Sequence, residues 1–324
     1  MFRFDFLDST IYTCLCGCGV CVCDMLLKPV NVQQTLLSRI LVGREGTRAL
    51  IGKTLYGSQC WRIMSSVSTA PSRTSYTNLS FHDIFTKEFP ADPETENQRR
   101  KVVGSAYSVI SPTPVAKPTL LGWSGDLAKT LGLPEDPQQV DKSVVEWLTG
   151  NRIPEGVTPW AHVYGGFQFG NWAGQLGDGR AINVGTVLTV DAYDGSPKGG
   201  RIAELQLKGS GETPYSRFAD GRAVLRSSIR EFVASEAMAA LGIPTTRALS
   251  ITLTGEGVDR DQFYNGNVKA EPGAVVCRVA PSFLRFGSIE WAAANDKNSL
   301  MEQYIDYTIR YFYPELQSLP KEER

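Results

Sequence analysis

The sequence has only two histidines, His82 and His162, no apolar run of about 18 residues, and a net charge of −1. Without a long apolar run the chain cannot cross a membrane several times, and we expect no stable membrane insertion. A balanced net charge gives no electrostatic reason to expect a nucleic-acid partner. The composition, with 42% hydrophobic and 21% charged residues, is that of a globular protein and excludes whole-chain disorder, collagen and coiled coil.

Acidic residues are scarce near the N-terminus. Residues 1–78 carry eight basic and four acidic side chains, a net charge of +4, whereas residues 79–324 carry −5. Between residues 25 and 78 the only acidic residue is Glu45, and serine and threonine are frequent. This composition is typical of a mitochondrial transit peptide, and the alternative is a disordered basic tail without a targeting role. We therefore predict a disordered, targeting leader over 1–78 and a mitochondrial location.

Five of the seven cysteines lie within the first 23 residues: Cys14, Cys16, Cys18, Cys21 and Cys23. Thiolates this close could bind zinc or copper(I), but no second pair of cysteines or histidines with ligand spacing follows. The favoured interpretation is an unstructured upstream segment, with translation starting at Met25 or Met64. The remaining cysteines, Cys60 and Cys277, are isolated and predict no disulfide framework.

From Leu79 onward, hydrophobic periodicity predicts a mixed α and β region. Glycine is dense over residues 164–180. A period of 3.6 residues predicts helices at 124–131 and 140–148, and one or two helices over 289–313. Alternating apolar residues predict strands at 181–190, 201–208, 250–254 and 274–279. The first two of these strands should pair as an antiparallel hairpin.

A further helix is predicted after this hairpin. Ser227 or Ser228 could cap it, since a hydroxyl accepts a hydrogen bond from a first-turn amide, and Gly242 ends it. We expect its apolar stripe to face the core, and the stripe consists of Ile229, Phe232, Val233, Ala237, Met238 and Leu241.

The order of three features points to a nucleotide site. Backbone amides of a glycine-rich run can approach phosphate oxygens closely. Lys208, at the end of the predicted hairpin, supplies a positive charge, and Glu231 on the next helix can hold that lysine in place, as in protein kinases. Each feature alone is weak, because glycine runs often serve tight packing and Lys–Glu pairs often lie on the surface. No Walker pattern is present.

Arginines add positive charge to this constellation. Arg278 lies inside an apolar predicted strand, where it must find an anion or a carboxylate, and Arg285 follows seven residues later. Both could bind phosphate through two parallel hydrogen bonds. Four more precede or begin the predicted helix and could form either a binding face or a solvated one: Arg217, Arg222, Arg226 and Arg230.

Two runs of sequence resemble the selenoprotein O family. The first is Tyr164–Arg180, which reads YGGFQFGNWAGQLGDGR, and the second is Leu205–Glu231, which reads LQLKGSGETPYSRFADGRAVLRSSIRE. The similarity covers about Leu79 to Leu316. It implies an α+β, protein-kinase-like fold over 79–324, mainly the N-terminal lobe with the start of the second lobe.

The resemblance also implies a function. Members of the family transfer AMP from ATP, with Mg²⁺ or Mn²⁺, to serine, threonine or tyrosine hydroxyls of substrate proteins. By motif match, the ATP-binding residues would be Gly177, Gly179, Arg180, Lys208, Asp220, Gly221, Glu231, Arg278 and Arg285.

This sequence departs from the family pattern in two ways. Phe167 replaces a usual histidine, and the segment with the family's catalytic aspartate and metal ligands does not occur before Arg324. We therefore expect no catalytic or metal residue in this chain and consider a non-catalytic nucleotide-binding module as an alternative; a purely structural protein is less consistent with the matched residues. We also expect the aromatic residues over 307–313 to form an exposed apolar surface.

Overall fold

The computed structural model describes residues 79–189 and 202–320. The leader predicted over 1–78, with its cysteine cluster, lies outside these residues, so its interpretation stays a prediction. The helices are α2 (Phe85–Glu88), α3 (Gly125–Thr130), α4 (Lys142–Trp147), α5 (Leu225–Ala240), α6 (Phe286–Ala294) and α7 (Asn298–Phe312), with 3₁₀ turns at Pro137–Gln139 and Pro314–Ser318. None of the helices in the described ranges is long and apolar enough to cross a membrane.

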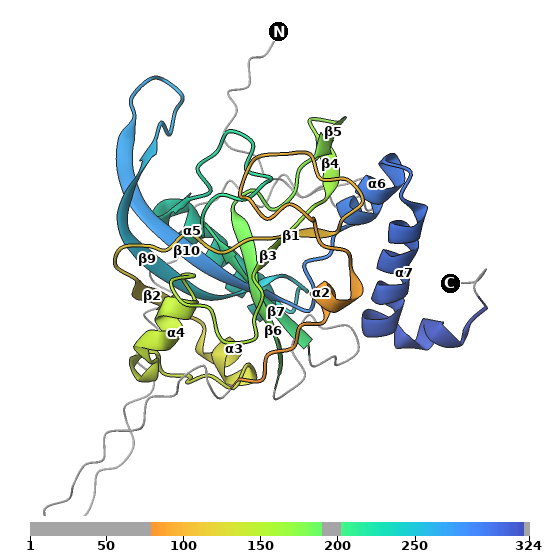
Figure 1. Cartoon of the computed structure of the whole chain (residues 1–324). Coiled ribbons are helices and arrows are strands. Elements are labelled where there is room, and N and C mark those ends of the chain that lie inside the picture. The colour runs from red at the N-terminus through yellow and green to blue at the C-terminus, as the bar shows by residue number, and fades with distance from the viewer. Residues whose placement is uncertain (1–78, 190–201, 321–324) are drawn as a thin grey trace, which may run out of the picture. The chain divides into compact units, whose positions relative to one another are not determined.

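The strands form a mainly antiparallel sheet, shown in Figure 1. They are β1 (Tyr107–Val109), β2 (Thr119–Trp123), β3 (Trp160–His162), β4 (Gly165–Gln168), β5 (Asn171–Gln175), β6 (Ala181–Leu188), β7 (Ile202–Lys208), β8 (Ala223–Val224), β9 (Arg247–Arg260) and β10 (Lys269–Ala280). The sheet order is β1-β3-β6-β7-β10-β9-β2, with β8 on β10, while β4 and β5 form a separate hairpin. The predicted antiparallel pairing of β6 with β7 is confirmed, and the mixed α and β character with it.

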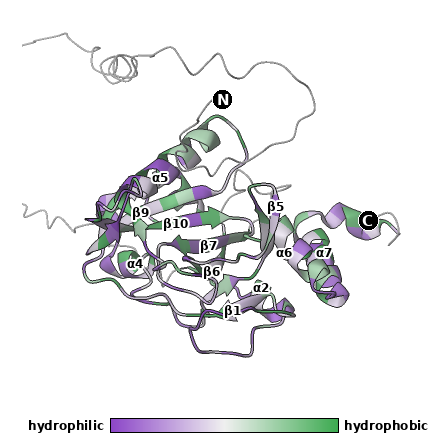
Figure 2. Cartoon of the chain, turned by 90° about the horizontal axis from the view of Figure 1, so that it is seen from above, coloured by the Kyte–Doolittle hydropathy of each residue, from purple (hydrophilic) through white to green (hydrophobic). Residues whose placement is uncertain are grey.

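The central strand β7 separates two environments. Its odd-numbered residues Ala203, Leu205 and Leu207 belong to the main apolar core, which also contains residues of α3 and α4. Its even-numbered residues Glu204, Gln206 and Lys208 point to the opposite face, because side chains alternate along a strand. Figure 2 shows α5 on one side of β9 and β10 and α4 on the other. The sheet therefore presents a polar strip to the side that α5 covers.

The aromatic end of α7 is buried, so the predicted exposed surface over 307–313 is wrong. Tyr307 is 2% exposed and packs edge-to-face on Phe85 and Phe89, with ring centroids 5.7 and 5.1 Å apart. Phe85 in turn stacks on Trp160 of β3, with centroids 4.5 Å apart. The short segment around α2 covers these rings, a long-range contact that no local pattern shows. Among the aromatic residues of this stretch only Tyr313 is exposed.

Helix α5 is present, but its predicted cap is wrong and most of its predicted inner stripe is exposed. Its N-cap is Val224, three residues before Ser227, and the hydroxyls of Ser227 and Ser228 donate to the carbonyl of Val224 and cap nothing. Of the predicted inner stripe, Phe232 packs against a buried cluster. The exposed members are Ile229, Val233, Ala237, Met238 and Leu241.

Two carboxylates explain the orientation of α5. Glu231 contacts Lys208 and Arg278 on the sheet, and Glu236 accepts hydrogen bonds from Arg247 of β9 at 2.7 and 2.9 Å. Leaving the arginines and the lysine unpaired would cost more than exposing a few aliphatic side chains. The polar partners of the helix therefore decide which face it turns inward.

Candidate functional site

A carboxylate on α5 joins cations from two strands. Glu231 accepts a hydrogen bond from Lys208 Nζ at one oxygen and from Arg278 Nε at the other, the latter at 2.6 Å. The side chains of all three residues are between 12% and 22% exposed. The pairing of Lys208 with Glu231 confirms the prediction from the sequence. Arg278 pairs with the same carboxylate, as expected for an arginine inside an apolar strand.

The strand register brings these groups together. Lys208 ends β7, and Arg278 lies directly opposite Gln206 in the antiparallel pair of β7 and β10. Alternation along β7 puts Gln206 and Lys208 on one face, two residues apart. Because α5 covers that face, its Glu231 reaches both cations.

The cluster carries more positive than negative charge. Burial alone would raise the pKa of Glu231, but the charges of Arg278 and Lys208 hold it below its usual value. Burial lowers the pKa of Lys208, an effect that Glu231 opposes and Arg278 reinforces. Desolvation and the charge of Arg278 also lower the pKa of Arg180, which places this residue in the same electrostatic cluster. Two cations pair with this one carboxylate and Arg180 acts on the same group electrostatically, so an anion would be attracted to the site.

The glycines of the predicted phosphate-binding turn pack tightly on the segment 213–216. A side chain at Gly177 would overlap the Tyr215 ring, with Cβ 2.4 Å from Cγ, and Gly177 has φ +76°. At Gly179 a Cβ would lie 2.8 Å from the Tyr215 carbonyl oxygen. Thr213 Oγ1 donates to the Asp178 carbonyl at 2.7 Å. Packing therefore requires glycine at both positions, whether or not the turn also binds phosphate.

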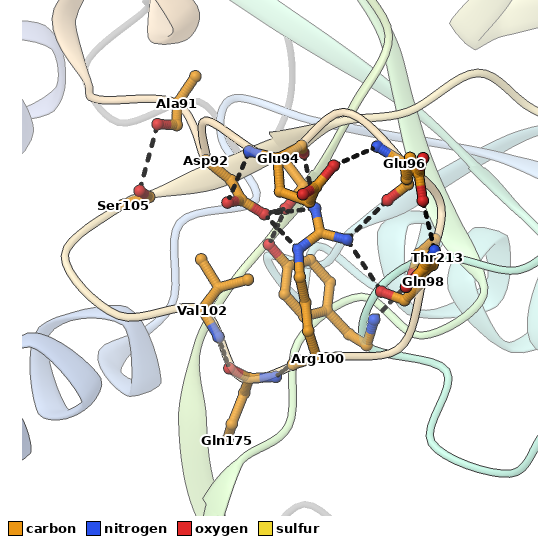
Figure 3. Close-up of polar contacts among 12 residues, drawn as sticks. Ala91, Asp92, Glu94, Glu96, Gln98, Arg100, Val102, Ser105, Gln175 and Thr213 are labelled. Atoms are coloured by element: carbon orange, nitrogen blue, oxygen red, sulfur yellow. Dashed lines mark hydrogen bonds and ion pairs between the residues drawn. The ribbon is translucent and has the colours of Figure 1, made fainter.

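Tyr215 is itself anchored by a network around Arg100 (Figure 3). The Arg100 guanidinium donates to Asp92 and to backbone carbonyls of the same loop. Asp92 accepts a hydrogen bond from Ser108 at 2.7 Å, and the Ser108 hydroxyl is 2.8 Å from the Tyr215 hydroxyl. The glycine turn thus rests on a rigid support that reaches back to the start of the domain.

Asp220 and Gly221 lie in a tight turn beside this support. Asp220 forms a two-pronged ion pair with Arg260, at 2.6 and 2.8 Å, and the bonds from Arg260 hold its pKa low against the effect of burial. Asp220 also acts electrostatically on Arg180. Gly221 has φ +68°, and a Cβ there would lie 2.1 Å from the backbone of Gly211.

Arg285 is connected to the cluster by its electrostatic effect on Asp178. Arg285 immediately precedes α6, and its guanidinium lies over the Tyr164 ring, 4.9 Å from the centroid. Burial raises the pKa of Asp178, whereas the charges of Arg285 and Arg278 lower it. The two arginines that the resemblance assigns to phosphate therefore both act on this one buried carboxylate. The nucleotide-binding roles of all nine residues stay predictions.

Two residues of the site were not singled out from the sequence. Gln206 and Asp178 are buried polar residues that connect Arg278 to the glycine turn. The signal for Gln206 was available, since residues 204, 206 and 208 are polar while the alternate residues of the strand are apolar. Asp178 gave no such signal within a run of glycines.

Arg222 and Arg226, near the start of α5, have partners outside the cluster. Arg226 pairs with Glu271 at 2.6 Å, and Arg222 donates to the carbonyls of Thr113 and Pro114. Arg226, at 39% exposed, matches the solvated-face alternative, whereas the Arg222 side chain is only 17% exposed. Phe167, which replaces the family's histidine, is 61% exposed and packs edge-to-face on Trp172 of the neighbouring strand.

Comparison with known proteins identifies relatives of most of the described region. A family described as protein adenylyltransferase SelO matches residues 93–324. A protein nucleotidyltransferase YdiU from Azoarcus sp. (strain BH72) is 54% identical over 246 residues, which are 76% of this chain and 46% of the relative. The YdiU proteins of Methylobacillus flagellatus and Xanthomonas campestris pv. campestris (strain 8004) are 51% and 54% identical over 76% and 74% of this chain, and 46% and 44% of their own lengths. The chain thus spans about half the length of these curated relatives.

Proposed function

The chain belongs to the SelO family of protein adenylyltransferases, and from this premise we propose that it binds ATP for the transfer of AMP to hydroxyl groups of substrate proteins. We further propose that the described domain is the nucleotide-binding part of a protein-kinase-like fold. A lysine on the sheet paired with a glutamate on the covering helix is the arrangement that supports this likeness.

The single observation that carries the proposal is the positive cluster around Glu231. Lys208 of β7 and Arg278 of β10 share this carboxylate, and Arg180, in the turn before β6, interacts with it electrostatically. Burial excludes much of the water that would weaken their attraction for phosphate. In the proposed complex Lys208 contacts the outer phosphates, and Arg278 and Arg285 bind further phosphate oxygens.

Fixed cations of this kind suit AMP transfer. In this step a hydroxyl loses its proton to a base and its oxygen bonds to the α-phosphorus of ATP, while the bond to the bridging oxygen breaks and pyrophosphate leaves with additional negative charge. Cations already held in place stabilise that charge without rearranging. The described residues contain no group of three histidine, cysteine, aspartate or glutamate side chains that could hold a metal ion, so no step of the proposal uses one.

Replacing Lys208 by methionine tests nucleotide binding. The substitution removes the ammonium group but keeps the aliphatic stem, and Glu231 still has Arg278 as its partner. We expect the Kd for ATP, measured by isothermal titration calorimetry on the 324-residue chain, to rise at least about tenfold. Lys142→Met is the control, because that lysine is 85% exposed in a surface pair with Glu146.

Two results would contradict the proposal: a wild-type chain that does not bind ATP, or a K208M variant that binds it as tightly as wild type. ATP labelled at the α-phosphate then separates transfer from binding. Label incorporated into an acceptor protein supports the transferase, whereas binding without incorporation supports the nucleotide-binding module.

We also propose that residues 1–78 direct the protein to mitochondria. The support is their basic, acid-poor composition alone. A fluorescent protein fused after residue 78 should be imported, and exchanging the seven basic residues between positions 28 and 73 for glutamine should leave it in the cytosol. Identical localisation of both fusions would refute targeting by this segment.

A further inference from the structure

We infer that Gln206 is a positioning residue, which orients the guanidinium of Arg278 by linking it to the buried carboxylate of Asp178. The inference rests on the proposed function, because the effect that it predicts is a change in the affinity for ATP. It adds two residues, neither assigned to the nucleotide, to the machinery that shapes the phosphate-binding side of the site.

The amide of Gln206 is fixed in one orientation. Its Nε2 donates to Asp178 Oδ2 at 3.1 Å, and its Oε1 accepts from Arg278 Nη1 at 3.1 Å. Gln206 is fully buried, so water cannot replace either partner. Because Asp178 can only accept as a carboxylate and Arg278 can only donate, a flipped amide would lose both hydrogen bonds.

Asp178 is a firm anchor for this link. Its Oδ2 also accepts from the backbone N–H of His162 at 3.2 Å, and its own N–H donates to the His162 carbonyl at 2.9 Å. Its carbonyl accepts from Thr213. The residue also sits between Gly177 and Gly179, so the same anchor holds the glycine turn and, through Gln206, the arginine.

Arg278 gains a defined plane from these contacts. Nε binds Glu231 and Nη1 binds Gln206, from two different elements. Two fixed points leave a planar guanidinium no freedom to rotate. In the described part of the chain Nη2 has no protein hydrogen-bond partner. The link from Asp178 through Gln206 to Arg278, called the relay below, leaves this nitrogen oriented to bind a phosphate oxygen.

The test compares two buried amides on neighbouring strands. Gln206→Met removes both relay bonds with little change in shape. Asn183→Leu is the matched control: Asn183 is opposite Gln206 on β6, is 1% exposed, and donates only a long bond of 3.4 Å to the Trp160 carbonyl. We expect Q206M to raise the Kd for ATP about tenfold and N183L to leave it unchanged. Thermal unfolding confirms that both variants are folded.

A double variant that conserves the net charge gives a measurement that would not change if Gln206 had only a structural role. Gln206→Glu alone places two carboxylates side by side and should weaken ATP binding. Adding Asp178→Asn restores a donor–acceptor bond between the two positions and keeps one negative charge on the Arg278 side. The double variant should therefore bind ATP more tightly than Q206E, with most of the wild-type affinity recovered.

The outcomes separate this inference from the proposed function. If wild type binds ATP and K208M does not, while Q206M binds as wild type or no more weakly than N183L, the relay is refuted and the nucleotide site stands. Failure of D178N to improve Q206E refutes the relay as well. If the wild-type chain does not bind ATP, the proposed function fails, and the inference fails with it.

Discussion

Replacing Glu231 by glutamine is expected to destabilise the folded chain by about 3 kcal/mol, because it removes the one carboxylate that two partly buried cations share. A glutamine keeps the shape and can accept from one cation, but its NH₂ group then faces the other. For a domain of this size the loss lowers the Tm by roughly 6–12 °C. Thermal unfolding followed by circular dichroism measures it.

An exposed ion pair is the control. Arg99 and Glu212 pair at 2.6 Å, and their side chains are 49% and 47% exposed. Solvent screens that pair, so Glu212→Gln should cost less than about 1 kcal/mol. Equal destabilisation by E231Q and E212Q would show that the Glu231 cluster is not a buried charge network, and it would remove the physical basis of the site.

The second large effect concerns Glu204, the neighbour of Gln206 along the polar strip of β7. Glu204 is 2% exposed, and its Oε2 accepts a hydrogen bond from the Phe283 N–H at 2.8 Å. Burial raises its pKa to about 8. We expect Glu204→Gln, which resembles the protonated acid, to be more stable than wild type by up to about 4 kcal/mol near pH 8.

The sign follows from proton binding. The pKa in the folded chain, about 8, lies above the ordinary glutamate value of 4.5, so the folded state holds a proton that the unfolded state has released. This contribution to stability is complete below pH 4.5 and is lost as the pH rises to about 8. Burial lowers the pKa of His162 well below 6.5, so the contribution of His162 to the stability of the fold is lost in the opposite direction, as the pH falls. The difference between wild type and variant isolates Glu204.

Urea unfolding of both proteins from pH 5 to pH 8 measures that difference. The free energies of unfolding should be similar near pH 5 and should diverge steadily toward pH 8. Glu212→Gln is the control for the loss of one negative charge, since Glu212 is an exposed partner of Arg99. A pH-independent difference between wild type and E204Q would contradict the raised pKa.

Local patterns in the sequence were enough to predict the longer elements of the domain. Apolar alternation predicted β6 and β7 and their antiparallel pairing, and helical periodicity predicted α3 and α4 to within a few residues and one or two helices where α6 and α7 lie. The strand β9 was predicted too short, because regular apolar alternation covers only its middle, with Ile251 and Leu253. Local periodicity succeeds where one face of an element is buried against a core.

The orientation of α5 and the burial of the α7 aromatics could not be predicted in this way. An apolar stripe indicates an inward face only if nothing polar competes for that face, and here Glu231 and Glu236 do. The rings of α7 meet Phe85 and Phe89 from more than two hundred residues earlier in the chain. Contacts at such separation leave no periodic trace in the sequence.

The sequence by itself determined the family, the pair of Lys208 with Glu231, and the need of Arg278 for a negative partner, because motif spacing and the cost of burying a charge are properties of the chain alone. Only the tertiary structure decided that one carboxylate serves both cations and that Gln206 and Asp178 stand behind Arg278. The physical reason is register: hydrogen bonds between β7 and β10 place residues 206 and 278 opposite each other, and that alignment depends on the folded sheet.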